Sequence, residues 1–247
     1  MRILVVNSNT TAAMTERIGR SAREAASPGT EIIATNPREG PVSVEGHYDA
    51  AFAVPGMLRV IRSHPDADGV VIACADDPGL YAAREIARCP VIGHTEAATA
   101  FAARIAYRFA IVTTLSRSVP VFHELLDRYG LVRQCCSVRG SDVPVLDLER
   151  PESGARGRVL AEAREAVERD GAEAIVLGCA GMTDLARWMA GELGVPVIDG
   201  VAAGVRMAEA LHALGLTTSK RGAFADPGPK IYHGLYDVDA PATRPVT

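Results

Sequence analysis

The chain has 247 residues, enough for one domain or for two domains of roughly 100 to 150 residues each. Hydrophobic residues at 48% and charged residues at 23% are typical of a folded globular protein, which argues against an intrinsically disordered chain. The formal net charge is −4, no Lys/Arg block occurs and aromatic residues make up 5%, so we expect neither nucleic acid nor a membrane surface as a partner.

Short apolar runs alternate with helical patterns along the first half of the chain. Strands are expected at residues 2–6, 31–35, 70–73 and 91–92, and helices at 14–26, 48–62, 80–87 and 96–105. Polar or Pro/Gly-rich loops separate them. Strands of a parallel sheet that is covered on both faces have such continuous apolar runs, so this order predicts a parallel α/β arrangement.

The pattern starts again at Arg108, where RFAIVTTLSRS resembles RILVVNSNTT at the start of the chain. Strands are expected at residues 108–112, 134–138, 175–178 and 197–198, and helices at 119–129, 158–169, 183–192 and 201–214. The tail from Thr217 onward is polar and rich in Pro and Gly. We expect it to lie over the surface or fray, with Leu235 and Tyr236 among its few apolar anchors.

Two stretches of the chain agree position by position. ADGVVIACADDPGL carries an apolar strand that leads to Cys74, and AEAIVLGCAGMTDL carries one that leads to Cys179. The strands that follow, CPVIG and VPVID, also correspond. The two cysteines lie 105 residues apart, and Pro90 and Pro196 lie 106 apart. We interpret this nearly constant offset as an internal duplication.

The duplication predicts an α/β fold with two similar lobes, each a parallel sheet flanked by helices. We expect pseudo-twofold symmetry between the lobes, with the active site in the cleft that they share. The first lobe should comprise residues 1–97, completed by the C-terminal segment 204–247, and the second should comprise residues 98–203.

The start of the chain runs directly into a strand pattern without a signal-peptide-like segment, and no apolar run reaches membrane-spanning length. We therefore expect a cytoplasmic protein. Five cysteines in such a chain are expected to be free thiols rather than a disulfide framework.

Ligands of open parallel sheets bind outside the carboxyl ends of the strands, and four loops of this chain lie there. If the lobes face each other, these loops converge on one cleft with a thiol on each side. Amides and hydroxyls in the loops are suited to hold a carboxylate or an imide, although each one is equally suited to capping a loop or helix. The candidate substrate-binding residues are Asn7, Asn9, Thr10, Ala75, Asp76, Asp77, Thr113, Thr114, Ala180, Gly181 and Met182.

Cys74 and Cys179 each stand between a strand and a helix pattern, where the helix N-terminus favours a thiolate. On opposite walls of a cleft, one thiolate can remove a proton from carbon while the other thiol delivers a proton to the opposite face. Such acid–base catalysis contributes about 10²- to 10⁴-fold and inverts a stereocentre. A single free cysteine is usually a small buried hydrophobe, but two at equivalent repeat positions favour the catalytic interpretation.

The other candidate residues carry weaker signals. No Cys or His grouping has the spacing of zinc ligands, so we expect no metal. Asp76 and Asp77 are suited to cap the helix after Cys74, and a carboxylate near that thiol would raise its pKa. His94 ends a strand beside the cleft, where a structural role is at least as well supported as a catalytic one.

Four motifs resemble the aspartate/glutamate racemase superfamily: RILVVNSNTT, IACADDPGL, IVTT and LGCAGM. The resemblance extends from residue 2 to about residue 200, and DDPGL with GCAGM is most similar to the hydantoin and allantoin racemase branch. The resemblance implies two similar α/β lobes, a cofactor-independent two-base mechanism, a small-molecule substrate and a homo-oligomer. It also implies that Cys74 and Cys179 are the proton donor and acceptor.

The resemblance therefore predicts a racemase that interconverts D- and L-5-monosubstituted hydantoins at carbon 5. Allantoin racemase, or another isomerase or decarboxylase of the superfamily, remains an alternative, as does a two-lobed protein that binds a small ligand without transforming it. Many relatives in the family carry an aromatic residue directly after the first cysteine, where this chain has Ala75. The smaller side chain predicts room for bulky 5-substituents.

Overall fold

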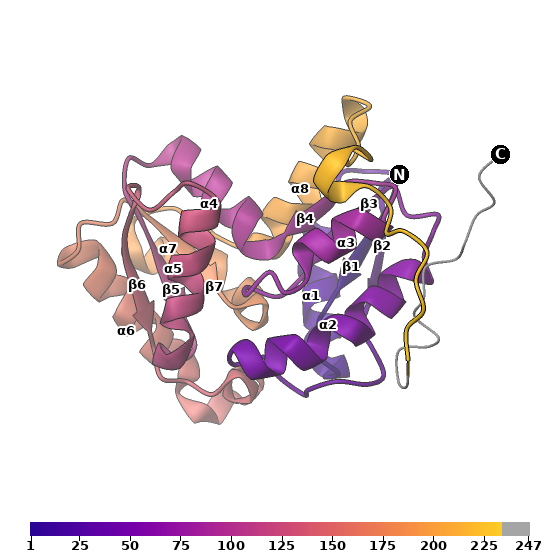
Figure 1. Cartoon of the computed structure of the whole chain (residues 1–247). Coiled ribbons are helices and arrows are strands. Elements are labelled where there is room, and N and C mark those ends of the chain that lie inside the picture. The colour runs from indigo at the N-terminus through magenta and orange to yellow at the C-terminus, as the bar shows by residue number, and fades with distance from the viewer. Residues whose placement is uncertain (234–247) are drawn as a thin grey trace.

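The computed structural model describes residues 1–233 and has two lobes, each built on a parallel four-stranded sheet (Figure 1). The first sheet has the order β2-β1-β3-β4, with β1 (Arg2–Val6), β2 (Glu31–Thr35), β3 (Gly69–Ile72) and β4 (Val91–Gly93). The second has the order β6-β5-β7-β8, with β5 (Phe109–Thr113), β6 (Cys135–Gly140), β7 (Ala174–Gly178) and β8 (Val197–Ile198). The matching order confirms the predicted two-lobed α/β fold.

The repeat in the sequence is also a repeat in the structure. Strands β3 and β7 begin 105 residues apart, and β4 and β8 begin 106 residues apart. Each of β3 and β7 is central in its sheet and buried along its whole length. Residues just beyond these two strands that lie 105 apart, Cys74 and Cys179 among them, therefore occupy equivalent places in the two lobes.

Helices cover both faces of each sheet, which explains the continuous apolar strands. The α-helices are α1 (Ala12–Ala25), α2 (His47–Arg62), α3 (Leu80–Ile86), α4 (His94–Ile105), α5 (Val119–Arg128), α6 (Ala155–Glu168), α7 (Ala186–Leu193) and α8 (Gly200–Ala213). The 3₁₀ helices are η1 (Ser116–Ser118), η2 (Val145–Glu149), η3 (Pro151–Ser153), η4 (Ala180–Leu185) and η5 (Gly222–Phe224). Across residues 1–233, no helix has both the length and the apolar composition needed to cross a bilayer.

Alternate residues of the first sheet pack against different helices. Val71 belongs to a core cluster with Ile18 of α1 and Val205 of α8. The neighbouring Ile72 belongs to a second cluster with Met57 of α2, on the other face. This alternation follows from the period of two in a strand, and it explains why no polar residue interrupts the strand.

The segment predicted as one helix at 183–192 differs in the structure. A 3₁₀ helix, η4, comes first and α7 follows it. The Met182 N–H donates to the Cys179 carbonyl at 3.0 Å, which closes a tight turn directly after β7. Residues 180–183 and Leu185 are buried and Asp184 alone of this segment is exposed, so the segment lacks the alternating buried and exposed faces of an amphipathic α-helix.

Helix α8 packs on the first sheet although it follows the strands of the second. A Cβ atom on Gly204 would lie 2.8 Å from the Val71 side chain, so only glycine permits this close approach to β3. Glu209 accepts hydrogen bonds from the backbone N–H of Ser27 and the Thr30 hydroxyl, both at 2.7 Å.

These contacts support the predicted division of the chain. We propose that the first lobe comprises residues 1–97 and the segment from 204, and that the second comprises residues 98–203. The part of that segment beyond residue 233, with Leu235 and Tyr236, lies outside the described residues.

Candidate active site

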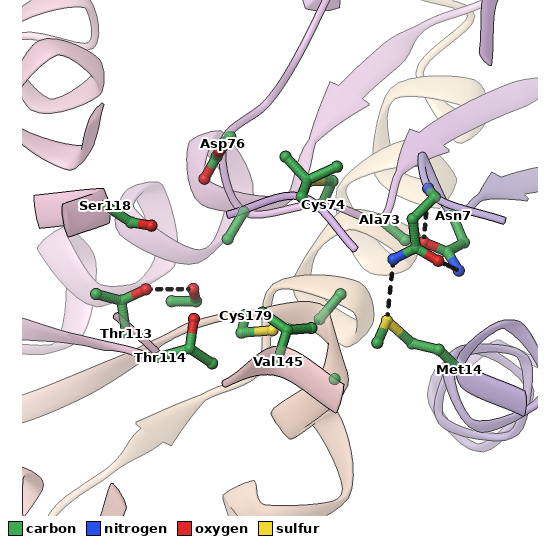
Figure 2. Close-up of a pocket in the computed structure, with 16 residues that line it drawn as sticks. Asn7, Met14, Ala73, Cys74, Asp76, Thr113, Thr114, Ser118, Val145 and Cys179 are labelled. Atoms are coloured by element: carbon green, nitrogen blue, oxygen red, sulfur yellow. Dashed lines mark hydrogen bonds between the residues drawn. The ribbon is translucent and has the colours of Figure 1, made fainter. Parts of the chain in front are cut away.

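A cavity of about 30 Å³ lies between residues of the two lobes and has both predicted catalytic cysteines in its wall (Figure 2). This space has room for about two water molecules, so a substituted ring needs the surrounding loops to move apart. The lining residues are Asn7, Asn9, Met14, Val44, Ala73, Cys74, Ala75, Asp76, Thr113, Thr114, Ser118, Val145, Gly178, Cys179, Ala180 and Gly181.

The two cysteines reach the cavity by the same local design. Each stands just beyond the carboxyl end of a central buried strand, β3 for Cys74 and β7 for Cys179. Each sulfur accepts a hydrogen bond from the backbone N–H two residues further on, which belongs to Asp76 in the first lobe and to Gly181 in the second. The pseudo-symmetry of the fold therefore brings two equivalent thiols to one cavity.

The environment of both cysteines favours the protonated thiol. Burial raises the pKa of Cys74 well above its usual range, and the charge of Asp76 raises this pKa further. Burial likewise raises the pKa of Cys179 to about 12, although the Gly181 N–H lowers it. The expectation that helix N-termini favour the thiolates is thus wrong, because α3 starts only at Leu80 and because desolvation outweighs the hydrogen bonds to sulfur.

Asp76 has a buried oxygen in the cavity wall. Its Oδ2 atom has no hydrogen-bond partner among the described residues. Burial raises the pKa of this carboxyl to about 6, while His47 lowers the pKa and Asp49 raises it. In Figure 2 the carboxylate extends toward the side of the pocket that Ser118 lines. The predicted influence of this charge on the Cys74 pKa agrees with the structure.

Asp77 has a different role from the neighbouring Asp76. Its buried carboxylate accepts hydrogen bonds from the backbone N–H of Thr95 at 3.1 Å and of Glu96 at 2.9 Å, and from the Tyr129 hydroxyl at 2.7 Å. The prediction that Asp77 caps the helix after Cys74 is wrong, because it caps α4 instead. Its φ of +44° turns the side chain into the protein, and Asp77 does not line the cavity.

The two asparagines of the first loop line the cavity but are bonded within the loop. The Asn7 amide donates to Asn9 Oδ1 at 2.9 Å and to the Thr15 hydroxyl at 3.0 Å. Asn9 Oδ1 also accepts from the Thr11 N–H at 2.9 Å. The loop-capping alternative therefore accounts for most of the hydrogen-bonding capacity of these side chains.

The threonines predicted for the site separate into two groups. Thr113 and Thr114 line the cavity, and the Thr113 hydroxyl donates to the Gly178 carbonyl at 3.0 Å. Thr10 lies outside the lining, where its hydroxyl donates to the Pro41 carbonyl at 3.3 Å. Threonines in the equivalent loops of the two lobes therefore differ, because those of the second lobe line the cavity and Thr10 of the first does not.

The turn after Cys179 contributes Ala180 and Gly181 to the cavity, whereas Met182 is fully buried in the core of the second lobe. Besides Ala73 and Gly178, which directly precede the two cysteines, four lining residues were missed by sequence reasoning: Met14, Val44, Ser118 and Val145. The sequence contained a signal for Ser118 alone, because this residue lies in the SRS tripeptide that follows the Thr113-Thr114 pair. The other three are apolar residues whose position depends on how α1, η2 and the loop before α2 pack across the cleft.

His94 is fully buried, and it lies against Gly200 rather than in the cavity. Neither ring nitrogen has a hydrogen-bond partner among the described residues. Burial lowers the pKa of His94 to about 4, while Asp199 raises it. The structure favours the packing role over the catalytic role at this position.

We expect His94→Leu to remove an acid-dependent loss of stability. Because the folded-state pKa is lowered, the contribution of neutral His94 is complete above about pH 6.5 and is lost as the pH falls toward 4. At pH 5 this loss amounts to about 2 kcal/mol. Urea unfolding of wild type and variant at pH 5 and pH 7.5 checks this: the variant should gain relative stability at pH 5, and an equal difference at both pH values would contradict it.

Residues 3–208 match the sequence model of the Asp/Glu/Hydantoin racemase family. The chain belongs to this family. It is 49% identical to hydantoin racemase from Rhizobium meliloti over 92% of this chain and 95% of that protein. It is 44% identical to hydantoin racemase from Pseudomonas sp. strain NS671, over 96% of each chain. These relatives identify the chain as a racemase, in agreement with the resemblance of its four motifs.

Solved structures agree with this assignment. Allantoin racemase from Klebsiella pneumoniae superposes with a TM-score of 0.94 at 50% sequence identity, over 96% of this chain and 98% of that chain. Glutamate racemase from Francisella tularensis superposes with a TM-score of 0.63 at 18% identity, over 89% of this chain and 84% of that chain, which is a likeness of fold alone. The two-lobed architecture is therefore common to this chain and both of these structures.

Proposed function

We propose that this racemase interconverts the D and L forms of 5-monosubstituted hydantoins, with Cys74 and Cys179 as its two bases. The observation that carries the proposal is that both cysteines line one cavity from equivalent positions in the two lobes. The identity of 49% to a hydantoin racemase supports the substrate class.

The proposed reaction needs one thiolate and one thiol on opposite faces of carbon 5. The thiolate takes the hydrogen of carbon 5 as a proton, and the electron pair of that bond moves into the neighbouring carbonyl to form an enolate. The opposite thiol then gives its proton to carbon 5 on the other face. Each turnover exchanges the protonation states of Cys74 and Cys179, so the reaction requires no cofactor.

The charge state of the site sets conditions on this mechanism. Because both thiol pKa values are raised, the form with one thiolate is a minority species at neutral pH. The backbone N–H groups of Asp76 and Gly181, which donate to the two sulfurs, favour that form. Donors in the cavity wall, among them the Thr114 hydroxyl, are suited to stabilise the enolate oxygen.

Allantoin is a second candidate substrate because it also contains the hydantoin ring. The similarity to allantoin racemase from Klebsiella pneumoniae, at a TM-score of 0.94, favours it. Aspartate and glutamate are less suitable because they bring carboxylates into a pocket that already holds Asp76. A neutral ring avoids this repulsion.

The proposal is tested with one enantiomer of a 5-substituted hydantoin, followed by circular dichroism after the protein is added. The signal should decay to zero under the proposed function. It should stay constant if the chain only binds the ligand. A parallel panel with allantoin, aspartate and glutamate in deuterated water identifies the preferred substrate, because each turnover places deuterium on the stereocentre.

Ala75 lines the cavity directly after Cys74 and is 5% exposed. We expect Ala75→Phe to reduce kcat/KM for 5-benzylhydantoin by at least about tenfold relative to 5-methylhydantoin, because the larger ring fills space beside carbon 5. Ala75→Ser is the matched control, since it adds a single oxygen atom. Equal turnover of the small and large substrates by Ala75→Phe would contradict the expectation.

We further propose that the racemase acts in the cytoplasm as a homo-oligomer. Large apolar side chains on the surface of the single chain support the oligomer, including Tyr48 at 74% and Tyr107 at 83% exposure. Light scattering coupled to gel filtration measures the assembly directly.

A further inference from the structure

Asp76 stands out in the cavity wall because it presents a hydrogen-bond acceptor to which the protein supplies no donor. Its Oδ2 atom is buried and has no partner among the described residues. A buried carboxylate oxygen without a donor lowers stability, and such groups are uncommon away from functional sites. The neighbouring Asp77 shows the contrast, since three donors bond its carboxylate.

The polar side chains around Asp76 do not direct their protons toward it. The Ser118 hydroxyl donates to the Glu45 carbonyl at 3.3 Å, and the Thr113 hydroxyl donates to the Gly178 carbonyl at 3.0 Å. The Asn7 amide donates within its own loop. These three side chains line the same cavity as Asp76, so its hydrogen-bond partner is expected to be a ligand group.

We infer that the Asp76 carboxylate accepts a hydrogen bond from a ring N–H of the bound substrate and selects neutral cyclic ureides with that N–H. This inference rests on the proposed function. A hydantoin ring offers two such donors, at N1 and at N3, and both lie in the plane of the ring. A hydrogen bond in that plane leaves the two faces of carbon 5 open to Cys74 and Cys179.

Two further observations agree with this role. The carboxylate extends toward the side of the pocket lined by Ser118, so it is directed into the space that a ligand would occupy (Figure 2). The pKa of Asp76 is raised only to about 6, so the group is an ionised acceptor at the slightly alkaline pH where thiols begin to ionise. If Asp76 acted only by raising the pKa of Cys74, its Oδ2 atom would still have no hydrogen-bond partner.

The test compares 5-benzylhydantoin with its 1-methyl and 3-methyl derivatives, each with wild type, Asp76→Ala and Asp76→Asn. Methylation at the bonded nitrogen should lower kcat/KM of wild type by about 10²-fold or more. In Asp76→Ala the same methylation should lower kcat/KM by less than about threefold. The acceptor is gone in this variant, and the smaller side chain leaves space for the methyl group. Asp76→Asn should be intermediate, since its amide oxygen still accepts.

Ser118→Ala is the matched control, because it removes a hydroxyl from the same side of the cavity that is already bonded to Glu45. This variant should keep the full cost of methylation, whatever its overall rate. Equal methylation costs in wild type, Asp76→Ala and Asp76→Asn at both nitrogens would overturn the inference while the proposed function stands. Failure of wild type to racemise the unmethylated hydantoin would overturn both.

Thermal unfolding gives a second readout that does not depend on turnover. Asp76→Ala should have a melting temperature equal to or above that of wild type, because it removes a buried acceptor without a partner. A marked decrease in melting temperature, together with an unchanged methylation cost in Asp76→Asn, would show that Asp76 is a structural residue and would contradict the inference.

Discussion

Cys74→Ser and Cys179→Ser should each lower racemisation of a hydantoin by about 10²- to 10⁴-fold. In the proposed mechanism each sulfur serves one face of carbon 5, and a serine hydroxyl is too weak an acid and base to replace it. Each variant should nevertheless exchange the carbon 5 hydrogen of one enantiomer with solvent deuterium, because the remaining cysteine still removes a proton from its own face. Proton NMR in deuterated water measures the exchange, and circular dichroism measures racemisation.

Cys89→Ser is the control for the cysteine variants. Cys89 precedes β4, is partly buried and does not line the cavity, so its replacement should leave racemisation nearly unchanged. If Cys74→Ser and Cys179→Ser both retained the wild-type rate, the two-base mechanism would be wrong. If each variant exchanged both enantiomers equally, the assignment of one sulfur to each face would be wrong.

Asp77→Ala should destabilise the fold by about 3 kcal/mol or more, because it leaves three donors without an acceptor in a buried site. The variant also places alanine at a φ of +44°, a conformation that Asp and Asn tolerate better. Burial raises the pKa of Asp77 to about 7, so the part of its contribution that depends on the protonated form is largest in acid and is lost as the pH rises through 7, while the three hydrogen bonds remain. Urea unfolding should therefore show a larger destabilisation at pH 6 than at pH 8.

Asp142→Ala is the matched control for Asp77→Ala. Asp142 has a φ of +49° and accepts a hydrogen bond from the Ser116 N–H at 3.0 Å, but this contact is exposed. Replacement there tests the backbone conformation without burial, and it should move the unfolding midpoint much less. Similar midpoint changes in the two variants would show that backbone strain, rather than the lost hydrogen bonds, accounts for the effect at Asp77.

The adjacent residues Asp76 and Asp77 show where prediction from the sequence stops. Both follow Cys74 in a loop beyond a strand, and both were candidate substrate contacts on that ground. In the structure, one lines the cavity and the other bonds the first turn of α4, 18 residues further along the chain. The cause is the left-handed backbone at Asp77, which the amino-acid type permits but does not require.

The cysteine pKa values show a second limit. The position of each cysteine after a strand was predicted correctly. For a solvent-exposed thiol, the helix N-terminus at such a position would favour the thiolate. Desolvation reverses the balance for Cys74 and Cys179. This effect depends on all atoms packed around each cysteine, and Cys179 packs against a core cluster that includes Met14 and Val145 from distant segments.

The sequence by itself determined the order of strands and helices, the two-lobed fold and the equivalence of Cys74 and Cys179. These properties are encoded in continuous apolar runs and in an offset of 105 residues, both of which can be read along the chain. Only the tertiary structure decided which polar side chains face the cavity, which are bonded elsewhere, and how strongly each thiol holds its proton. Those outcomes depend on contacts between residues far apart in the chain. There, small changes in side-chain direction and burial determine whether a polar group finds a hydrogen-bond partner.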